Sequence, residues 1–192
     1  HVRVYQYNGS SWSQLGSNIE GEVGGDNSGK SVTLSNDGTI VAIGSPENDG
    51  VNGSNSGHVR VYQRDEGNTT VEPLGWTQLG SDIDGEATDD KSGTSVALNG
   101  DGTILAIGAP ENSAIYTDTG LVKIYKYANE SWTQVGTDID GENEDDYAGA
   151  SVALSSNGMY VAIGAPGNNY VKIYKWNDIC NSSNEKRGNI CK

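Results

Sequence analysis

The chain has 192 residues, among them 27 glycines, 10 tyrosines, 4 tryptophans and no phenylalanine. Its 12 basic and 26 acidic residues give a net charge of -14, which repels nucleic-acid phosphates and anionic membrane surfaces. No apolar run approaches the roughly 20 residues that cross a bilayer. These properties predict no nucleic-acid binding and no membrane insertion, and they favour short strands joined by polar turns.

Two short motifs, Ser-Val-x-Leu and Gly-(Ser/Ala)-Pro, recur along the chain and define an internal repeat. The copies are Ser31–Leu34 with Gly44–Pro46, Ser95–Leu98 with Gly108–Pro110, and Ser151–Leu154 with Gly164–Pro166. Differences in spacing between the copies fall in the connections, where repeat proteins tolerate insertions. The pattern predicts three tandem units, approximately 1–57, 58–119 and 120–177, followed by a tail of different composition, 178–192.

Each unit is predicted to supply four antiparallel strands. Strand one is Ser-Val-x-Leu, in which apolar residues alternate, and a tight turn rich in Asn, Asp and Gly follows it. Strand two, such as Thr39–Gly44, is continuously apolar, so we expect it to be covered on both faces and to lie deep, near a crowded axis. Strand three, such as His58–Tyr62, alternates aliphatic residues with a basic residue. Strand four carries a tryptophan, such as Trp76.

These features predict an all-β, β-propeller-like fold of three tandem four-stranded antiparallel blades. Closed propellers typically need four to eight blades, so three blades leave exposed strand edges that invite pairing with another chain. The chain begins with strands three and four and ends its last repeat with a further strand three, Tyr170–Tyr174. We therefore expect an open array, or one completed by copies of the same chain in a ring or fibre, or by the remaining blades of a longer chain.

The basic position of strand three recurs next to tyrosine in every copy. It is occupied by Arg3, Arg60, Lys123 and Lys172. A basic ring for an anionic ligand is one interpretation, but recurrence in every copy favours a contact between blades, with the basic stem packed over an aromatic ring. His1 and His58 also lie in strand three, and Leu121 and Tyr170 replace them in later copies. A structural role is therefore predicted for both histidines.

The motifs Ser28-Gly29 with Gly44-Ser-Pro46, and Ala148-Gly149 with Gly164-Ala-Pro166, resemble the FG-GAP repeat of integrin α-subunits and related extracellular proteins. The resemblance covers 1–177 and implies a blade fold, an adhesion or recognition role, and no catalytic residues. The phenylalanine of the family motif is absent from all copies. Short turns also replace the Asp-rich calcium loop of the family, so that calcium site is not expected here.

Acidic residues before strand one are the main candidates for metal binding. A carboxylate at every second position around a Gly turn can converge on Ca²⁺, which takes six to eight oxygen ligands. The predicted calcium ligands are Asp82, Asp84, Glu86 and Asp90 in one copy and Asp138, Asp140, Glu142 and Asp146 in the next. The alternative is an exposed acidic connection that keeps the array soluble. Because the acids recur in every copy, they do not resemble the single carboxylate pair of a glycosidase, and no enzyme is predicted.

Asn-x-Ser/Thr sequons are candidate sites for N-linked glycans. They begin at Asn8, Asn52, Asn68, Asn129 and Asn181. Those at Asn8, Asn68 and Asn129 precede the strand-four tryptophan in successive copies, which predicts a solvent-facing loop. Cys180 and Cys191 are the only cysteines, and either a local disulfide or two thiols in a reducing compartment would account for them, the disulfide being favoured.

Together these predictions describe an extracellular or cell-surface, non-enzymatic structural and adhesive module that carries glycans. The alternative function is a lectin-like domain that binds carbohydrate or protein. Tyr116 and Tyr147, at expected loop tips, are its candidate aromatic platforms.

Overall fold

The computed structural model describes residues 1–176, and all regular structure in this part is β-strand. Within it there is no helix with the length and apolarity that a membrane crossing requires. The predicted disulfide between Cys180 and Cys191 and the sequon at Asn181 lie outside the described residues.

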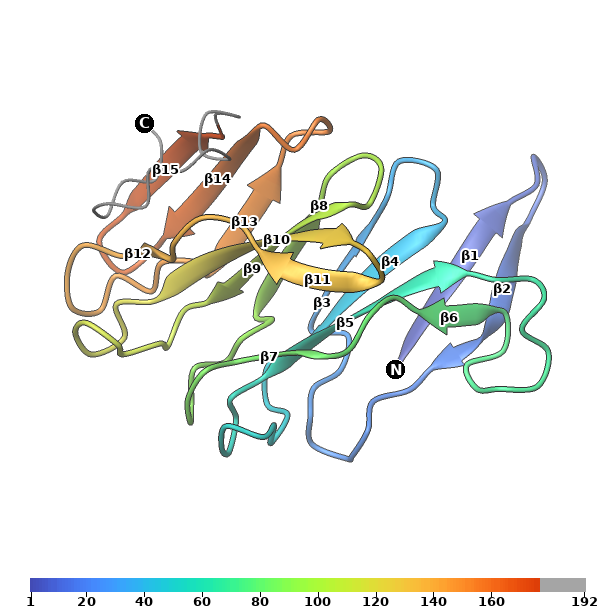
Figure 1. Ribbon diagram of the computed structural model, residues 1–192, viewed down its shortest axis with the longest axis horizontal. Coiled ribbons are helices and arrows are strands. Elements are labelled where there is room, and N and C mark those ends of the chain that lie inside the picture. Colours follow the sequence, from blue (N-terminus) through green and yellow to red (C-terminus); the bar gives the residue numbers. More distant parts are fainter. Residues whose placement is uncertain (177–192) are drawn as a thin grey trace.

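Antiparallel pairing groups the strands into four sheets, which lie side by side from the N-terminal to the C-terminal end without closing into a ring (Figure 1). Blade 1 contains β1 (Val2–Tyr7) and β2 (Trp12–Ile19); blade 2 contains β3 (Ser31–Leu34), β4 (Ile40–Ser45), β5 (His58–Arg64), β6 (Trp76–Gln78) and β7 (Ile83–Asp84); blade 3 contains β8 (Ser95–Leu98), β9 (Ile104–Ala109), β10 (Leu121–Ala128), β11 (Ser131–Gln134) and β12 (Ile139–Asp140); blade 4 contains β13 (Ser151–Leu154), β14 (Tyr160–Ala165) and β15 (Tyr170–Lys175). The predicted fold class, all-β with antiparallel sheets of about four strands in an open array, is confirmed.

Blades 2 and 3 contain all four predicted strand positions. β6 and β7 pair one after the other along β5, and β11 and β12 do the same along β10, so each pair forms one interrupted strand four. Blade 1 consists of strands three and four alone, and the described part of blade 4 consists of strands one to three.

Strand one, and not strand two, lies innermost in the array. β8 packs against β3 on one side and β13 on the other, so strand two, which was expected to lie deep and near the axis, is second from the axis after strand one. The expectation that strand two is covered on both faces holds for the interior blades, because all six residues of β9 are buried. Strand two is paired along both edges, and the neighbouring blades cover its two faces.

The hydrophobic core is divided into three clusters, one between each pair of successive blades. Between blades 1 and 2, Val4 and Ile19 pack against Val41, Ile43 and Trp76. The other two clusters join blade 2 to blade 3 and blade 3 to blade 4 in the same way. Each blade is thus stabilised mainly by its neighbours, as in other repeat proteins.

Candidate functional site

The acidic connections run from strand four of one blade to strand one of the next, and the last acid of each is buried. Asp26, Asp90 and Asp146 are 6%, 4% and 0% exposed. One carboxylate oxygen of Asp90 accepts hydrogen bonds from the backbone N–H groups of Glu86 and Ala87, and the other accepts one from the side-chain amide of Asn112. This aspartate therefore ties the connection to the loop that follows strand two.

Asp146 has the same arrangement and one more donor. It accepts hydrogen bonds from two backbone N–H groups, from the Asn168 amide and from the Tyr170 hydroxyl. Burial acts to raise the pKa of Asp146, but these hydrogen bonds outweigh it and hold the pKa below the ordinary value. A calcium ion at Asp90 or Asp146 would have to displace these donors.

The glutamates of the acidic connections pair with the basic residue of strand three. Lys123 forms ion pairs with Glu86 and with Asp138, at 3.7 Å from the latter. Lys172 pairs with Glu142 at 2.5 Å. The basic position therefore joins each blade to the connection that enters it from the preceding blade, which agrees with the predicted contact between blades.

The second acid of each connection, Asp84 or Asp140, is half-buried, and its surroundings disfavour the ionised form. Burial raises the pKa of Asp140, the charges of Asp138 and Glu86 raise it further, and Lys123 opposes them. Burial likewise raises the pKa of Asp84.

The predicted calcium ligands do not converge on one point. Within residues 1–176, the one group of three acidic, histidine or cysteine side chains whose ligand atoms lie within 4.8 Å of one another is Glu22, His58 and Asp82. This group shares a single member, Asp82, with the predicted sets.

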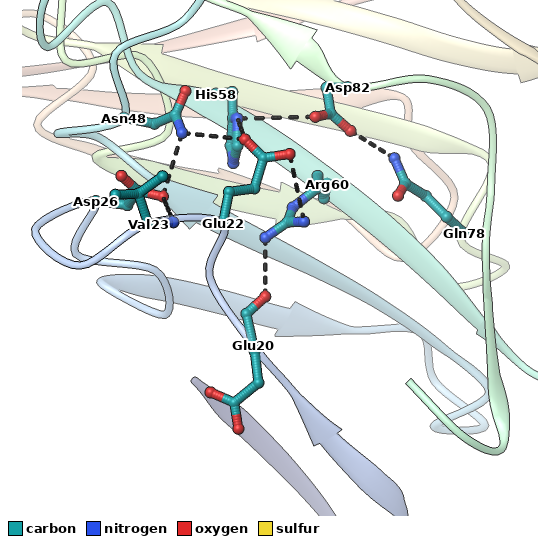
Figure 2. A network of polar contacts seen from close by, with 9 residues as sticks. All are labelled: Glu20, Glu22, Val23, Asp26, Asn48, His58, Arg60, Gln78 and Asp82. Carbon is teal, nitrogen blue, oxygen red and sulfur yellow. Dashed lines mark hydrogen bonds and ion pairs between the residues drawn. The ribbon is translucent and has the colours of Figure 1, made fainter. Parts of the chain in front are cut away.

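Three different elements position this triad (Figure 2). Glu22 lies in the connection after β2, His58 begins β5, and Asp82 lies between β6 and β7. The His58 Nδ1 atom lies 3.9 Å from Glu22 Oε2 and 3.9 Å from Asp82 Oδ2. The His58 side chain is 1% exposed, whereas those of Glu22 and Asp82 are 45% and 29% exposed. The imidazole of the triad is thus buried, whereas its two carboxylates are accessible to solvent.

The polar groups around the triad hold both carboxylates in place. Asn48 donates to Glu22 Oε2 at 3.3 Å, and the Arg60 guanidinium lies 3.8 Å from the other oxygen of Glu22. Gln78 donates to Asp82 Oδ1 at 2.6 Å, which leaves Oδ2 facing the imidazole. Burial and the charge of Arg60 lower the pKa of His58, against the opposing effect of the acids. The site therefore presents two carboxylates and an imidazole whose neutral form is favoured.

Sequence reasoning missed His58 as a candidate because it compared strand three between copies and took replacement as a sign of a structural role. The sequence did contain one indication that His58 lies near carboxylates. It is the only histidine with an acidic connection both before and after it in the chain, and it is two residues from Arg60.

The described sequons lie in loops, as expected, but their amides differ in environment. Asn8 and Asn129 are exposed in the turns between strands three and four. The Asn68 amide instead donates to the backbone carbonyls of Val71, Pro73 and Trp76, and the Asn52 amide donates to the Gly85 carbonyl. Glycosylation at these sites stays a prediction.

No protein-family model and no curated protein matches the sequence. Among solved structures, the chain is similar to the periplasmic gluconolactonase PpgL of Pseudomonas aeruginosa, with a TM-score of 0.56 and 18% identity over 91% of this chain and 46% of that one. It is also similar to the Cps50 (Swd1) β-propeller domain of Myceliophteria thermophila, with a TM-score of 0.48 and 11% identity over 75% and 38% of the two chains. A third similar structure is the hydrazine synthase of Kuenenia stuttgartiensis, with a TM-score of 0.46 and 14% identity over 85% and 47%.

The chain spans less than half the length of each of these proteins. At such low identity the likeness concerns the fold alone. The likeness to the gluconolactonase, the one of these three with a TM-score above 0.5, agrees with the row of antiparallel blades, and the chain has a β-propeller-like fold.

Proposed function

We propose that the chain is a non-enzymatic, extracellular structural and adhesive module whose row of blades continues into blades of another copy or of a longer chain. The observation that carries the proposal is that the contacts joining successive blades are left half-formed at both ends of the row. The FG-GAP resemblance and the exposed sequons support the extracellular and adhesive part.

A serine at the start of strand one bonds each interior blade to the next. Ser31 Oγ of blade 2 donates to the Gly93 carbonyl of blade 3 at 2.7 Å, and Ser95 Oγ of blade 3 donates to the Gly149 carbonyl of blade 4 at 2.6 Å. In blade 4, Ser151 occupies the donor position with no described blade beyond it. At the other end, the Gly29 carbonyl occupies the acceptor position, and among the described residues blade 1 includes no strand one to supply its serine.

The strand-four tryptophan makes a second recurring contact. The Trp76 indole N–H donates to the Leu15 carbonyl of the preceding blade at 3.0 Å, and that of Trp132 donates to the Leu79 carbonyl at 2.9 Å. Trp12 stands at the same position in blade 1, which has no preceding blade within residues 1–176, and is 67% exposed.

The apolar face of blade 4 is exposed where interior blades are buried. Val171 and Ile173 of β15 are 68% and 70% exposed, whereas Val59 and Val122, equivalent to Val171, are both 0% exposed. We call this the C-terminal face; it consists of Ala153, Tyr160, Ala162, Val171 and Ile173.

The other end of the row also exposes apolar side chains. Val32 and Leu34 of β3 are 53% and 48% exposed, whereas the equivalent Val96 and Leu98 of β8 are 8% and 7% exposed. The N-terminal face consists of Tyr5, Trp12, Val32 and Leu34. Since the two faces differ, contact between copies would be head-to-tail, which closes into a ring or extends into a fibre.

The test is the mass of the glycosidase-treated chain in sedimentation experiments over a range of concentrations. The proposal expects species at multiples of the 20.2 kDa chain mass. A 20.2 kDa monomer at every concentration would overturn self-assembly, and would leave the faces to be covered by further blades of a longer chain.

An aromatic pair favours the lectin-like alternative. Tyr7 and Trp12 are 53% and 67% exposed, with ring centroids 5.2 Å apart in the β1–β2 hairpin. Tyr116 is exposed as well, whereas the Tyr147 hydroxyl donates to Asp118. Quenching of Trp12 fluorescence by a glycan, at concentrations that leave the mass unchanged, would favour this function over assembly.

A further inference from the structure

The connection into blade 2 differs from the equivalent one in blade 3 in how its acids are neutralised. In blade 3, Lys123 pairs with both Glu86 and Asp138, and an apolar residue, Leu121, fills the first position of strand three. In blade 2, the first position holds His58, and the cation of Arg60 lies near Glu22. Arg60 also donates to the backbone carbonyl of Glu20. Two carboxylates therefore face an imidazole where blade 3 has a lysine between them.

The His58 imidazole is 1% exposed and faces the two carboxylates with its Nδ1 atom. Its other nitrogen, Nε2, is buried without a hydrogen-bond partner among the described residues. Its Nδ1 atom faces the two carboxylate oxygens at 3.9 Å, which is beyond hydrogen-bond distance. Buried polar groups are normally paired, and an ion between Nδ1 and the two carboxylate oxygens would give Nδ1 a partner.

We propose that Glu22, His58 and Asp82 bind one divalent transition-metal ion of the Zn²⁺ type, with Glu22 Oε2, His58 Nδ1 and Asp82 Oδ2 as ligand atoms. The ion would fasten the connection from blade 1 onto strands three and four of blade 2. Figure 2 shows these three side chains turned toward one another from separate elements. The site lies within a single chain and does not depend on assembly.

The dimensions of the triad suit such an ion. Zn²⁺ binds imidazole nitrogen and carboxylate oxygen at about 2.0–2.2 Å, which sets tetrahedral ligands about 3.4 Å apart. The two 3.9 Å separations would shorten by about 0.5 Å, which rotation of the half-exposed Glu22 and Asp82 side chains can supply. The open side leaves room for water as a further ligand. An imidazole ligand suits zinc and similar metals, whereas Ca²⁺ prefers oxygen alone.

Ser45 is a candidate hydrogen-bond acceptor for the imidazole of His58. Such histidines donate their other ring N–H to a nearby acceptor. Ser45 is the cross-strand partner of His58 and lies on the same face of the sheet. The Ser45 hydroxyl, like Nε2 of His58, is buried without a partner among the described residues, so it is the candidate acceptor for the Nε2–H group of a metal-bound His58.

The test is calorimetric titration of the full, chelator-treated chain with Zn²⁺, in a Cys180→Ser/Cys191→Ser background that keeps thiols from binding the metal. We expect one Zn²⁺ ion per chain and an increase in melting temperature on binding. His58→Leu introduces the residue type that blade 3 has at the equivalent position, Leu121, and Asp82→Asn introduces the type that blade 1 has, Asn18. Each substitution should weaken Zn²⁺ binding by more than about tenfold. The matched control is Asp138→Asn, at the equivalent position in blade 3, which should leave Zn²⁺ affinity unchanged.

Two results would overturn the proposal. One is the absence of saturable Zn²⁺ binding by the parent chain. The other is an affinity that survives in both His58→Leu and Asp82→Asn, which would place the bound metal elsewhere, for example at His1. Circular dichroism of each variant establishes that it is folded, and the two substitutions lie in different elements, so the failure of one to fold leaves the other as the test.

Discussion

Gly108 of β9 lies against Gly149, just before the first strand of blade 4. A Cβ atom at Gly108 would overlap the Gly149 carbonyl oxygen and the Ser95 hydroxyl. Gly108→Ala must therefore push the blades apart and break the 2.6 Å hydrogen bond from Ser95 to Gly149. Overpacking costs about 1–3 kcal/mol, and the lost hydrogen bond about 0.5–1.5 kcal/mol. We expect the free energy of unfolding to fall by about 2–4 kcal/mol.

Urea denaturation followed by tryptophan fluorescence measures this loss. With a denaturant dependence of about 2 kcal/mol per molar urea, the midpoint should fall by about 1–2 M. The matched control is Gly164→Ala at the equivalent position of β14, where an added Cβ would overlap only the rotatable Ser151 hydroxyl of its own blade. Its cost should stay within about 0.5 kcal/mol. Equal costs for the two substitutions would refute the view that this glycine exists to let the next blade approach.

Other substitutions test further parts of the account. Trp76→Ala should cost about 3–5 kcal/mol in urea denaturation because it empties a buried site, whereas Trp12→Ala at the equivalent exposed position should cost less than about 0.5 kcal/mol; similar values would contradict the assignment. Asp90→Ala leaves two backbone N–H groups and one amide without an acceptor, so it should cost at least about 2 kcal/mol in thermal unfolding, and a neutral effect would rule out its bridging role. Asp140→Asn should stabilise the chain at pH 7, because the folded state raises the pKa of Asp140 and so disfavours its charge. This advantage should shrink as the pH falls through the raised pKa, since the folded wild type then binds its proton before the unfolded chain does; an advantage that grows on acidification would contradict the sign.

The strand content and blade architecture could be predicted from the sequence because both rest on local periodicity repeated three times. The order of strands within a blade was harder. Strands one and two are both apolar, and only the packing of β8 between β3 and β13 shows that strand one is innermost.

Burial within the repeat could not be predicted from the motif. Val32 and Val96 stand at the same place in the same motif, yet they are 53% and 8% exposed. The difference comes from the presence or absence of a neighbouring strand one, which the motif does not encode.

The candidate site was predicted only in part. The acidic connections were identified, but each was treated as a unit that folds around its own ion. In the structure, Glu86 pairs with Lys123 of the following blade, and Asp90 accepts hydrogen bonds from backbone N–H groups. The approach of Glu22 and Asp82 to His58 depends on β5 lying between two connections, a tertiary relation that spacing along the chain does not reveal.

The most direct test of the proposed assembly uses two variants that each block one face. One carries Trp12→Lys and Leu34→Lys in the N-terminal face, and the other carries Ala162→Lys and Ile173→Lys in the C-terminal face. In sedimentation experiments, each variant alone should remain a 20.2 kDa monomer, and an equimolar mixture should form dimers through the one intact pair of faces. Variants that keep the wild-type mass, or a mixture that stays monomeric while the wild type assembles, would contradict head-to-tail docking of the blades.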